Sequence, residues 1–141
     1  MRVDNLLITD FPHIYEDETI DEAIDDLVEN PVHSLPVFSR DNTMIGELSQ
    51  TELLLEIIGD EEIEGDFDLS SIQHLLSSGA STVQPMVNRH ELSVRPDDHV
   101  LEAVKLMYDE DLSTLPVEDQ DGSFVGIITD IVILEHYDEL N

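Results

Sequence analysis

The apolar residues of this chain follow the same pattern twice, eighty residues apart. In each copy a nine-residue stretch is apolar at the spacing of an α-helix with one buried face. In the first copy these positions are Ile20, Ala23, Ile24, Leu27 and Val28. In the second copy they are Val100, Ala103, Val104, Met107 and Tyr108. The pattern therefore predicts two equivalent amphipathic helices.

After each predicted helix, two short apolar runs are separated by a polar turn. Leu35-Pro36-Val37 and Gly46 of the first copy correspond to Leu115-Pro116-Val117 and Gly126 of the second, with no gap between the copies. Short apolar runs on both sides of a turn rich in Asp, Asn and Gly are typical of a β-hairpin. We therefore expect one hairpin in each copy.

Local signals bound the remaining elements of each copy. Thr19-Ile20-Asp21-Glu22 matches the capping box, in which the Thr oxygen accepts from the backbone of the first helical turn. Each copy is expected to begin with an extended segment, at residues 3–15 and 83–94, and to end with a helix, at residues 49–58 and 130–137. One copy therefore reads strand, helix, strand, strand, helix.

The duplication divides the chain into a first repeat (1–59), an acidic linker with a short helix (60–81) and a second repeat (82–141). A sheet of two or three strands with two helices cannot bury both of its faces alone. We therefore expect an α/β fold of the α+β type, in which the repeats pack face to face about a pseudo-twofold axis and leave clefts between them.

The charge is strongly acidic. Asp and Glu number 34 against 5 Lys and Arg, a formal charge of −29, while 40% of the residues are hydrophobic. Such a surface argues against nucleic acid or an anionic membrane as a partner, because both require basic residues. It is typical of proteins that work at high internal salt, with an ordinary acidic protein as the alternative. The sequence has no cysteine and no apolar run long enough to span a membrane, so we expect a cytoplasmic protein.

The two LPV steps, the two strand glycines and the helices led by Glu22-Ala23 and Glu102-Ala103 resemble a tandem pair of cystathionine-β-synthase (CBS) domains, the Bateman module. The resemblance implies a regulatory module and not an enzyme. Members of this family hold AMP, ADP, ATP or S-adenosylmethionine in the clefts, require no cofactor and often form homodimers. The effector protein would be a separate, unknown partner.

The resemblance also implies site residues. A Ser or Thr after the glycine strand and an acid three residues later hold the ribose in this family. The first repeat offers Ser49 and Glu52, whereas the second offers Thr129 but has Val132 three residues on, with Asp130 as the nearest acid. The ligand would also pass along the strand starts, at His33, Ser34, Leu35, Pro36, Thr114, Leu115 and Pro116.

Two alternatives stay open at this stage. Ser49 to Glu52 also matches a helix capping box, so the same residues could serve the fold alone. The chain could then be a ligand-free scaffold for dimerisation or protein interaction. If a ligand binds, the scarcity of basic residues favours a low-charge or cationic adenosyl compound, and a triphosphate would require Mg²⁺ or screening salt.

No catalytic or metal motif is evident. Residues 60–68 place acids in the alternating pattern of an EF-hand loop, but Ser71 stands where the loop requires a bidentate Glu, so a solvated acidic linker is the favoured interpretation. The six histidines lack metal-binding spacing. We therefore predict no metal site.

Overall fold

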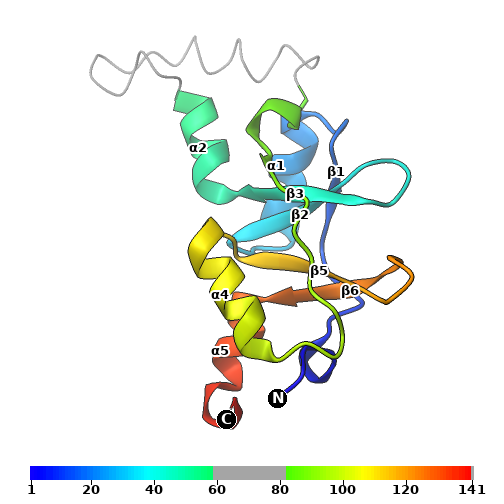
Figure 1. Cartoon of the computed structure of the whole chain (residues 1–141). Coiled ribbons are helices and arrows are strands. Elements are labelled where there is room, and N and C mark those ends of the chain that lie inside the picture. Colours follow the sequence, from blue (N-terminus) through cyan, green and yellow to red (C-terminus); the bar gives the residue numbers. More distant parts are fainter. Residues whose placement is uncertain (59–81, 141) are drawn as a thin grey trace. The chain divides into compact units, whose positions relative to one another are not determined.

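The computed structural model describes residues 1–58 and 82–140 (Figure 1). The acidic segment with the EF-hand-like spacing and the short helix predicted before Gly79 lie outside the described residues. The chain forms two compact units, one spanning Pro12–Arg89 and the other joining Met1–Phe11 to the residues from His90 onward. The first eleven residues thus belong with the second repeat.

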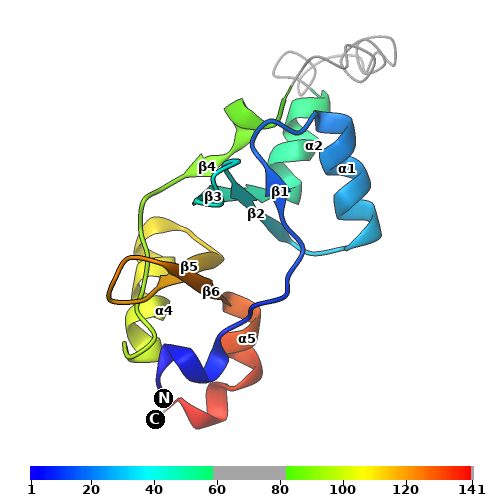
Figure 2. The same ribbon diagram turned by 90° about the vertical axis from the view of Figure 1, so that its right-hand side faces the viewer.

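The unit Pro12–Arg89 contains a four-stranded sheet of order β1-β2-β3-β4. Its elements are β1 (Ile14–Tyr15), α1 (Ile20–Glu29), β2 (Ser34–Phe38), β3 (Met44–Ser49), α2 (Gln50–Ile58), the 3₁₀ helix η2 (Gln84–Met86) and β4 (Asn88–Arg89). Strand β1 runs parallel to β2, and the other neighbouring strands are antiparallel. Both helices lie on one side of this sheet (Figure 2). The predicted order of strand, helix, strand, strand, helix is confirmed.

The other unit repeats this plan with fewer strand residues. Its elements are η1 (Val3–Leu6), α4 (Val100–Glu110), β5 (Thr114–Glu118), β6 (Phe124–Thr129), α5 (Asp130–Glu135) and η3 (Tyr137–Glu139). Strands β5 and β6 are antiparallel, and single bridges extend them: Val94 pairs parallel with Val117, and Ile8 pairs antiparallel with Ile127. These bridges stand where β1 and β4 lie in the first unit.

The helix cap predicted at Thr19 is present, but the predicted apolar stripe is too wide. Thr19 Oγ1 accepts a hydrogen bond from Glu22 N at 3.1 Å, and Ile20 and Ala23 are buried. Val28 is 74% exposed. At about 100° per residue Val28 stands about 80° around the helix axis from Ile20, at the edge of the buried face. Tyr108, its counterpart on α4, is exposed for the same reason.

The strand glycines mark the places where another segment of the same unit comes closest. A Cβ added to Gly126 would lie 2.6 Å from the carbonyl oxygen of Ile8, and one added to Gly46 would collide with the carbonyl of Asn88. Glycine is therefore required on both strands, because the backbone of the neighbouring segment occupies the space of a side chain.

Each unit has its own hydrophobic core between helices and sheet. Leu35, Val37 and Leu48 pack with α1 and α2 in one core, and Leu115, Val117 and Ile128 pack with α4 and α5 in the other. No helix within residues 1–58 and 82–140 is long and apolar enough to cross a membrane.

Candidate functional site

The predicted ribose-binding serine lies opposite a second serine at the end of the first hairpin. Ser34, the first residue of β2, is the register partner of Ser49, the last residue of β3. The start of α2 is tied to the same place, since Gln50 N donates to the carbonyl of His33 at 3.0 Å and Gln50 Nε2 donates to the carbonyl of Val32 at 2.7 Å. The hairpin end, defined as His33, Ser34, Ser49 and the first turn of α2, thus brings several predicted site residues together.

Ser49 caps helix α2. Its Oγ accepts a hydrogen bond from Glu52 N at 3.1 Å, as the capping interpretation requires. A serine hydroxyl that accepts one hydrogen bond still carries a proton to donate. The cap therefore leaves Ser49 able to interact with a ligand hydroxyl or ring nitrogen. Glu52 is exposed in the first helical turn, where its carboxylate can accept hydrogen bonds.

A buried acid lies beside these serines, and it was not among the site residues predicted from the sequence. Glu47 on β3 is only 5% exposed, and its Oε2 accepts a hydrogen bond from Ser34 Oγ at 2.7 Å. Glu47 pairs with Pro36 in the β2–β3 ladder, so Ser34, Pro36, Glu47 and Ser49 share one sheet face. Comparison of the two repeats could have revealed Glu47, because the matching position of the second copy holds the apolar residue Ile127.

The second repeat has hydroxyls in the same places. Thr114 and Thr129 are register partners, and Asp130 N donates to the carbonyl of Ser113 at 2.9 Å. Thr129 Oγ1 accepts from Val132 N at 3.2 Å and caps α5. The carboxylate of the nearest acid, Asp130, already bonds the next residue, since its Oδ1 accepts from Ile131 N at 2.8 Å. This hairpin end therefore has hydroxyls without an acid placed as Glu52 is.

The site residues predicted at the starts of β2 and β5 do not all present their side chains on the same face of the sheet. Leu35 and Leu115 belong to the two hydrophobic cores, so a ligand at either strand start could meet only their backbone. Pro36 and Pro116 lie on the opposite sheet face, together with Ser34 and Thr114. His33 is exposed just before β2.

The arginines are already engaged by acids or carbonyls. Ion pairs join Arg2 to Asp4 at 2.7 Å, Arg40 to Asp17 at 2.8 Å and Arg89 to Glu16 at 3.7 Å, and Arg95 Nη1 donates to the carbonyl of Asp119 at 3.0 Å. The Arg40 guanidinium also lies over the Tyr15 ring, 4.2 Å from its centroid, and its hydrogen bonds lower the pKa of Asp17.

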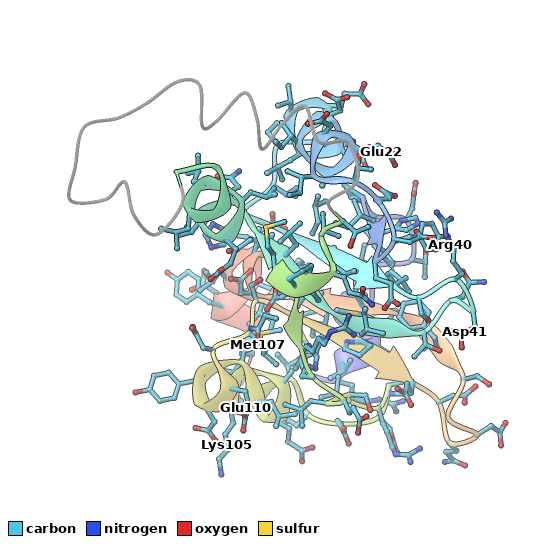
Figure 3. All side chains as sticks on the ribbon, turned by 90° about the horizontal axis from the view of Figure 1, so that it is seen from above. Glu22, Arg40, Asp41, Lys105, Met107 and Glu110 are labelled. Atoms are coloured by element: carbon cyan, nitrogen blue, oxygen red, sulfur yellow. The ribbon has the colours of Figure 1, made fainter. Side chains whose placement is uncertain are left out.

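The remaining cation, Lys105, extends outward from α4 (Figure 3). Within the described part of the chain, none of the five basic residues belongs to the hairpin end. A phosphate bound there would therefore lack a cationic side chain from this set.

Metal ligands are not grouped in the described ranges. No set of three or more His, Asp or Glu residues among them is placed to hold a metal ion. The EF-hand-like acids lie outside those ranges.

The family is shown by comparison with known proteins. The CBS domain model matches this chain twice, at residues 3–59 and 83–139. The chain therefore belongs to the CBS domain family, and the predicted tandem pair is confirmed. A curated relative, the chloroplastic CBS domain-containing protein CBSX1 of Arabidopsis thaliana, is 31% identical over 123 residues, which cover 79% of this chain and 52% of CBSX1.

Other similar proteins extend these findings. The chain spans less than a quarter of homoserine O-acetyltransferase from Methanococcus vannielii, to which it is 25% identical over 127 residues covering 90% of this chain and 23% of that enzyme. Among solved structures, CBSX2 in complex with AMP has a TM-score of 0.70 and 24% identity, covering 99% of this chain and 97% of CBSX2. At that identity the likeness shows a shared fold.

Proposed function

We propose that this protein is a regulatory module that binds an adenosyl ligand at the hairpin end of its first repeat and signals the bound state to a partner protein. The observation that carries the proposal is the pairing of Ser34 with Ser49 at the start of α2 in a chain of the CBS domain family. The complex of the similar protein CBSX2 with AMP supports an adenosine-containing ligand.

In this proposal the ribose hydroxyls meet Ser49 and Glu52. The Ser49 hydroxyl is fixed by its bond to Glu52 N, so the ligand meets a group whose position is already set. The Glu52 carboxylate accepts from a ribose hydroxyl.

The ligand is expected to carry little negative charge. The arginines of the described residues are already engaged, and the chain has a formal charge of −29. AMP or S-adenosylmethionine would meet less repulsion than ATP, which would require Mg²⁺. If the protein bound ATP without Mg²⁺ more tightly than both AMP and S-adenosylmethionine, the expected preference for a ligand of low negative charge would be wrong.

A homodimer is part of the proposal, formed through the outer faces of α4 and α5. Tyr108 on α4 is 86% exposed, and Ile131 and Leu134 on α5 are more than half exposed. Large apolar side chains on adjacent helices of so acidic a chain favour association with an equally apolar face. The partner at this face is a second copy of this chain.

The alternative is a ligand-free scaffold, favoured by Val132 at the position of the second acid. Mass spectrometry of compounds released from natively purified protein separates the two. Recovery of an adenosyl compound, with calorimetric binding in molar salt, supports the sensor. An empty protein with no binding of AMP, ATP or S-adenosylmethionine supports the scaffold.

A further inference from the structure

We infer that Glu47 selects the charge of the ligand, favouring an adenosyl compound that carries a cation, such as a sulfonium, over one that carries a phosphate. The inference rests on the proposed function, because it concerns the same hairpin end. It adds a specificity-determining residue outside the family's ribose-binding pattern, which consists of a Ser or Thr and an acid three residues later.

The position of Glu47 places its charge next to any ligand held by the two serines. Ser34 Oγ is in direct contact with the carboxylate, at 2.7 Å from Oε2. Ser49 lies two residues further along the same strand, and residues so spaced stand about 7 Å apart on one sheet face. A ribose bound at Ser49 therefore holds its 5′ substituent within reach of the field of this carboxylate.

Burial strengthens this field. Glu47 is 5% exposed, so water and salt screen its charge less than that of the many surface acids. The acids on the rest of the surface repel every anionic ligand of this chain to a similar degree, and molar salt screens this repulsion. The Glu47 carboxylate therefore keeps acting on a ligand at the hairpin end under those conditions.

The fold itself does not require an acid here. Ile127 holds the matching place on β6 and is 1% exposed, so an aliphatic side chain fits the same strand position in the second repeat. A buried carboxylate costs stability compared with such a side chain unless hydrogen bonds compensate. The acid is therefore particular to the hairpin end of the first repeat, where the proposed ligand binds.

The test measures two affinities of the full chain by calorimetry in one molar-salt buffer, with AMP and S-adenosylmethionine as probes. Wild type is expected to prefer S-adenosylmethionine, and Glu47→Gln to shift the ratio of the two dissociation constants about tenfold toward AMP. Gln keeps an oxygen for the Ser34 bond. Glu102→Gln, an equal charge change on an exposed residue of α4, is expected to leave the ratio unchanged.

The outcomes separate this inference from the proposed function. Binding of both probes with a ratio that Glu47→Gln does not alter, or a wild-type preference for AMP, overturns the inference and leaves the adenosyl site in place. Binding of neither probe to wild type rejects the proposed function and the inference with it. Should Glu47→Gln fail to fold, Glu47→Ile, which copies the second repeat, gives the same comparison.

Discussion

The Ser34 hydroxyl donates a hydrogen bond to the buried Glu47 carboxylate, with 2.7 Å between Oγ and Oε2. The two residues lie on adjacent strands of the first hairpin, two positions out of register and therefore on the same sheet face, and both border the proposed ligand site. The pair therefore links the stability of the sheet to the electrostatics of the site.

Replacing Ser34 with Ala is expected to lower the free energy of unfolding by about 2 kcal/mol, because a buried carboxylate loses a hydrogen-bond donor. Denaturant unfolding in molar salt measures the change. Ser123→Ala, on an exposed turn residue, serves as the control and should have little effect. In a Glu47→Ile background the Ser34 substitution should cost much less, and an equal cost in both backgrounds would contradict the proposed coupling.

Ser49→Ala and Thr129→Ala separate helix capping from ligand binding. Each removes an N-cap hydroxyl, from α2 and α5 respectively, so each should cost about 1 kcal/mol of stability. Only Ser49→Ala is expected to weaken adenosyl binding, by tenfold or more, measured by calorimetry. A double variant with Ser49→Ala and Glu52→Ala that kept wild-type affinity would remove this site from the proposal.

The repeat and its helix caps could be predicted from the sequence because their signals are local. The Thr19 cap depends on residues within one helical turn, and the two LPV steps align without a gap. The segment at residues 3–15 could not be predicted in the same way. It was expected to be extended, yet Val3–Leu6 forms a 3₁₀ helix. Its first two amides donate to carbonyls far along the chain, Val3 N to Asp98 O at 2.9 Å and Asp4 N to Pro96 O at 3.0 Å, so the turn depends on residues that local patterns do not include.

In the candidate site, too, only the residues whose roles depend on their neighbours in the sequence could be predicted. Ser49 and Thr129 could be placed at helix starts because the residues that follow them set the cap. Glu47 was missed because its burial and its bond to Ser34 depend on a strand thirteen residues away. Likewise, the exposure of Tyr108 depends on where the buried face of α4 ends.

Gly126→Ala is expected to destabilise the unit that joins residues 1–11 to the second repeat. The added Cβ would lie 2.6 Å from Ile8 O, and the two hydrogen bonds between Ile8 and Ile127, both 2.9 Å, would be strained. We expect a loss of about 2 kcal/mol and faster hydrogen exchange at the Ile8 amide. Gly122→Asn is the control, because Gly122 faces open space and Asn42 adopts a positive φ in the matching turn. Unchanged exchange at Ile8 in Gly126→Ala would contradict the close approach.

Leu134→Glu is expected to separate the proposed homodimer into monomers. Leu134 is 63% exposed on α5, so the change should leave the monomer folded while it places a charge in the apolar contact. Light scattering coupled to size-exclusion chromatography in molar salt measures the mass. Gln120→Glu adds the same charge at an exposed turn and should leave the mass unchanged. A Leu134→Glu protein with the mass of wild-type dimer would place the interface elsewhere.

Glu18 gives the first repeat a stability that depends on pH. Burial, followed by hydrogen bonding with Asp26, raises the pKa of Glu18 from 4.5 to about 7. Its Oε2 is buried and meets no donor within the described residues, which also favours the protonated form. Between these two pH values the folded protein holds more protons at this site than the unfolded chain. The stabilisation is therefore complete below about pH 4.5 and is lost as the pH rises through about 7.

Glu18→Gln should remove this dependence, since Gln stays neutral and can donate to Asp26. We expect the variant to be more stable than wild type by about 1 kcal/mol at pH 8, a value reduced for partial solvent exposure, and the difference to shrink toward pH 5. Unfolding midpoints across this range in molar salt measure it. Glu29→Gln, an equal charge change at an exposed position on α1 that does not act on the pKa of Glu18, provides the control. If Glu18→Gln and Glu29→Gln shifted the midpoint equally at every pH, the effect would come from net charge and not from the buried carboxyl group.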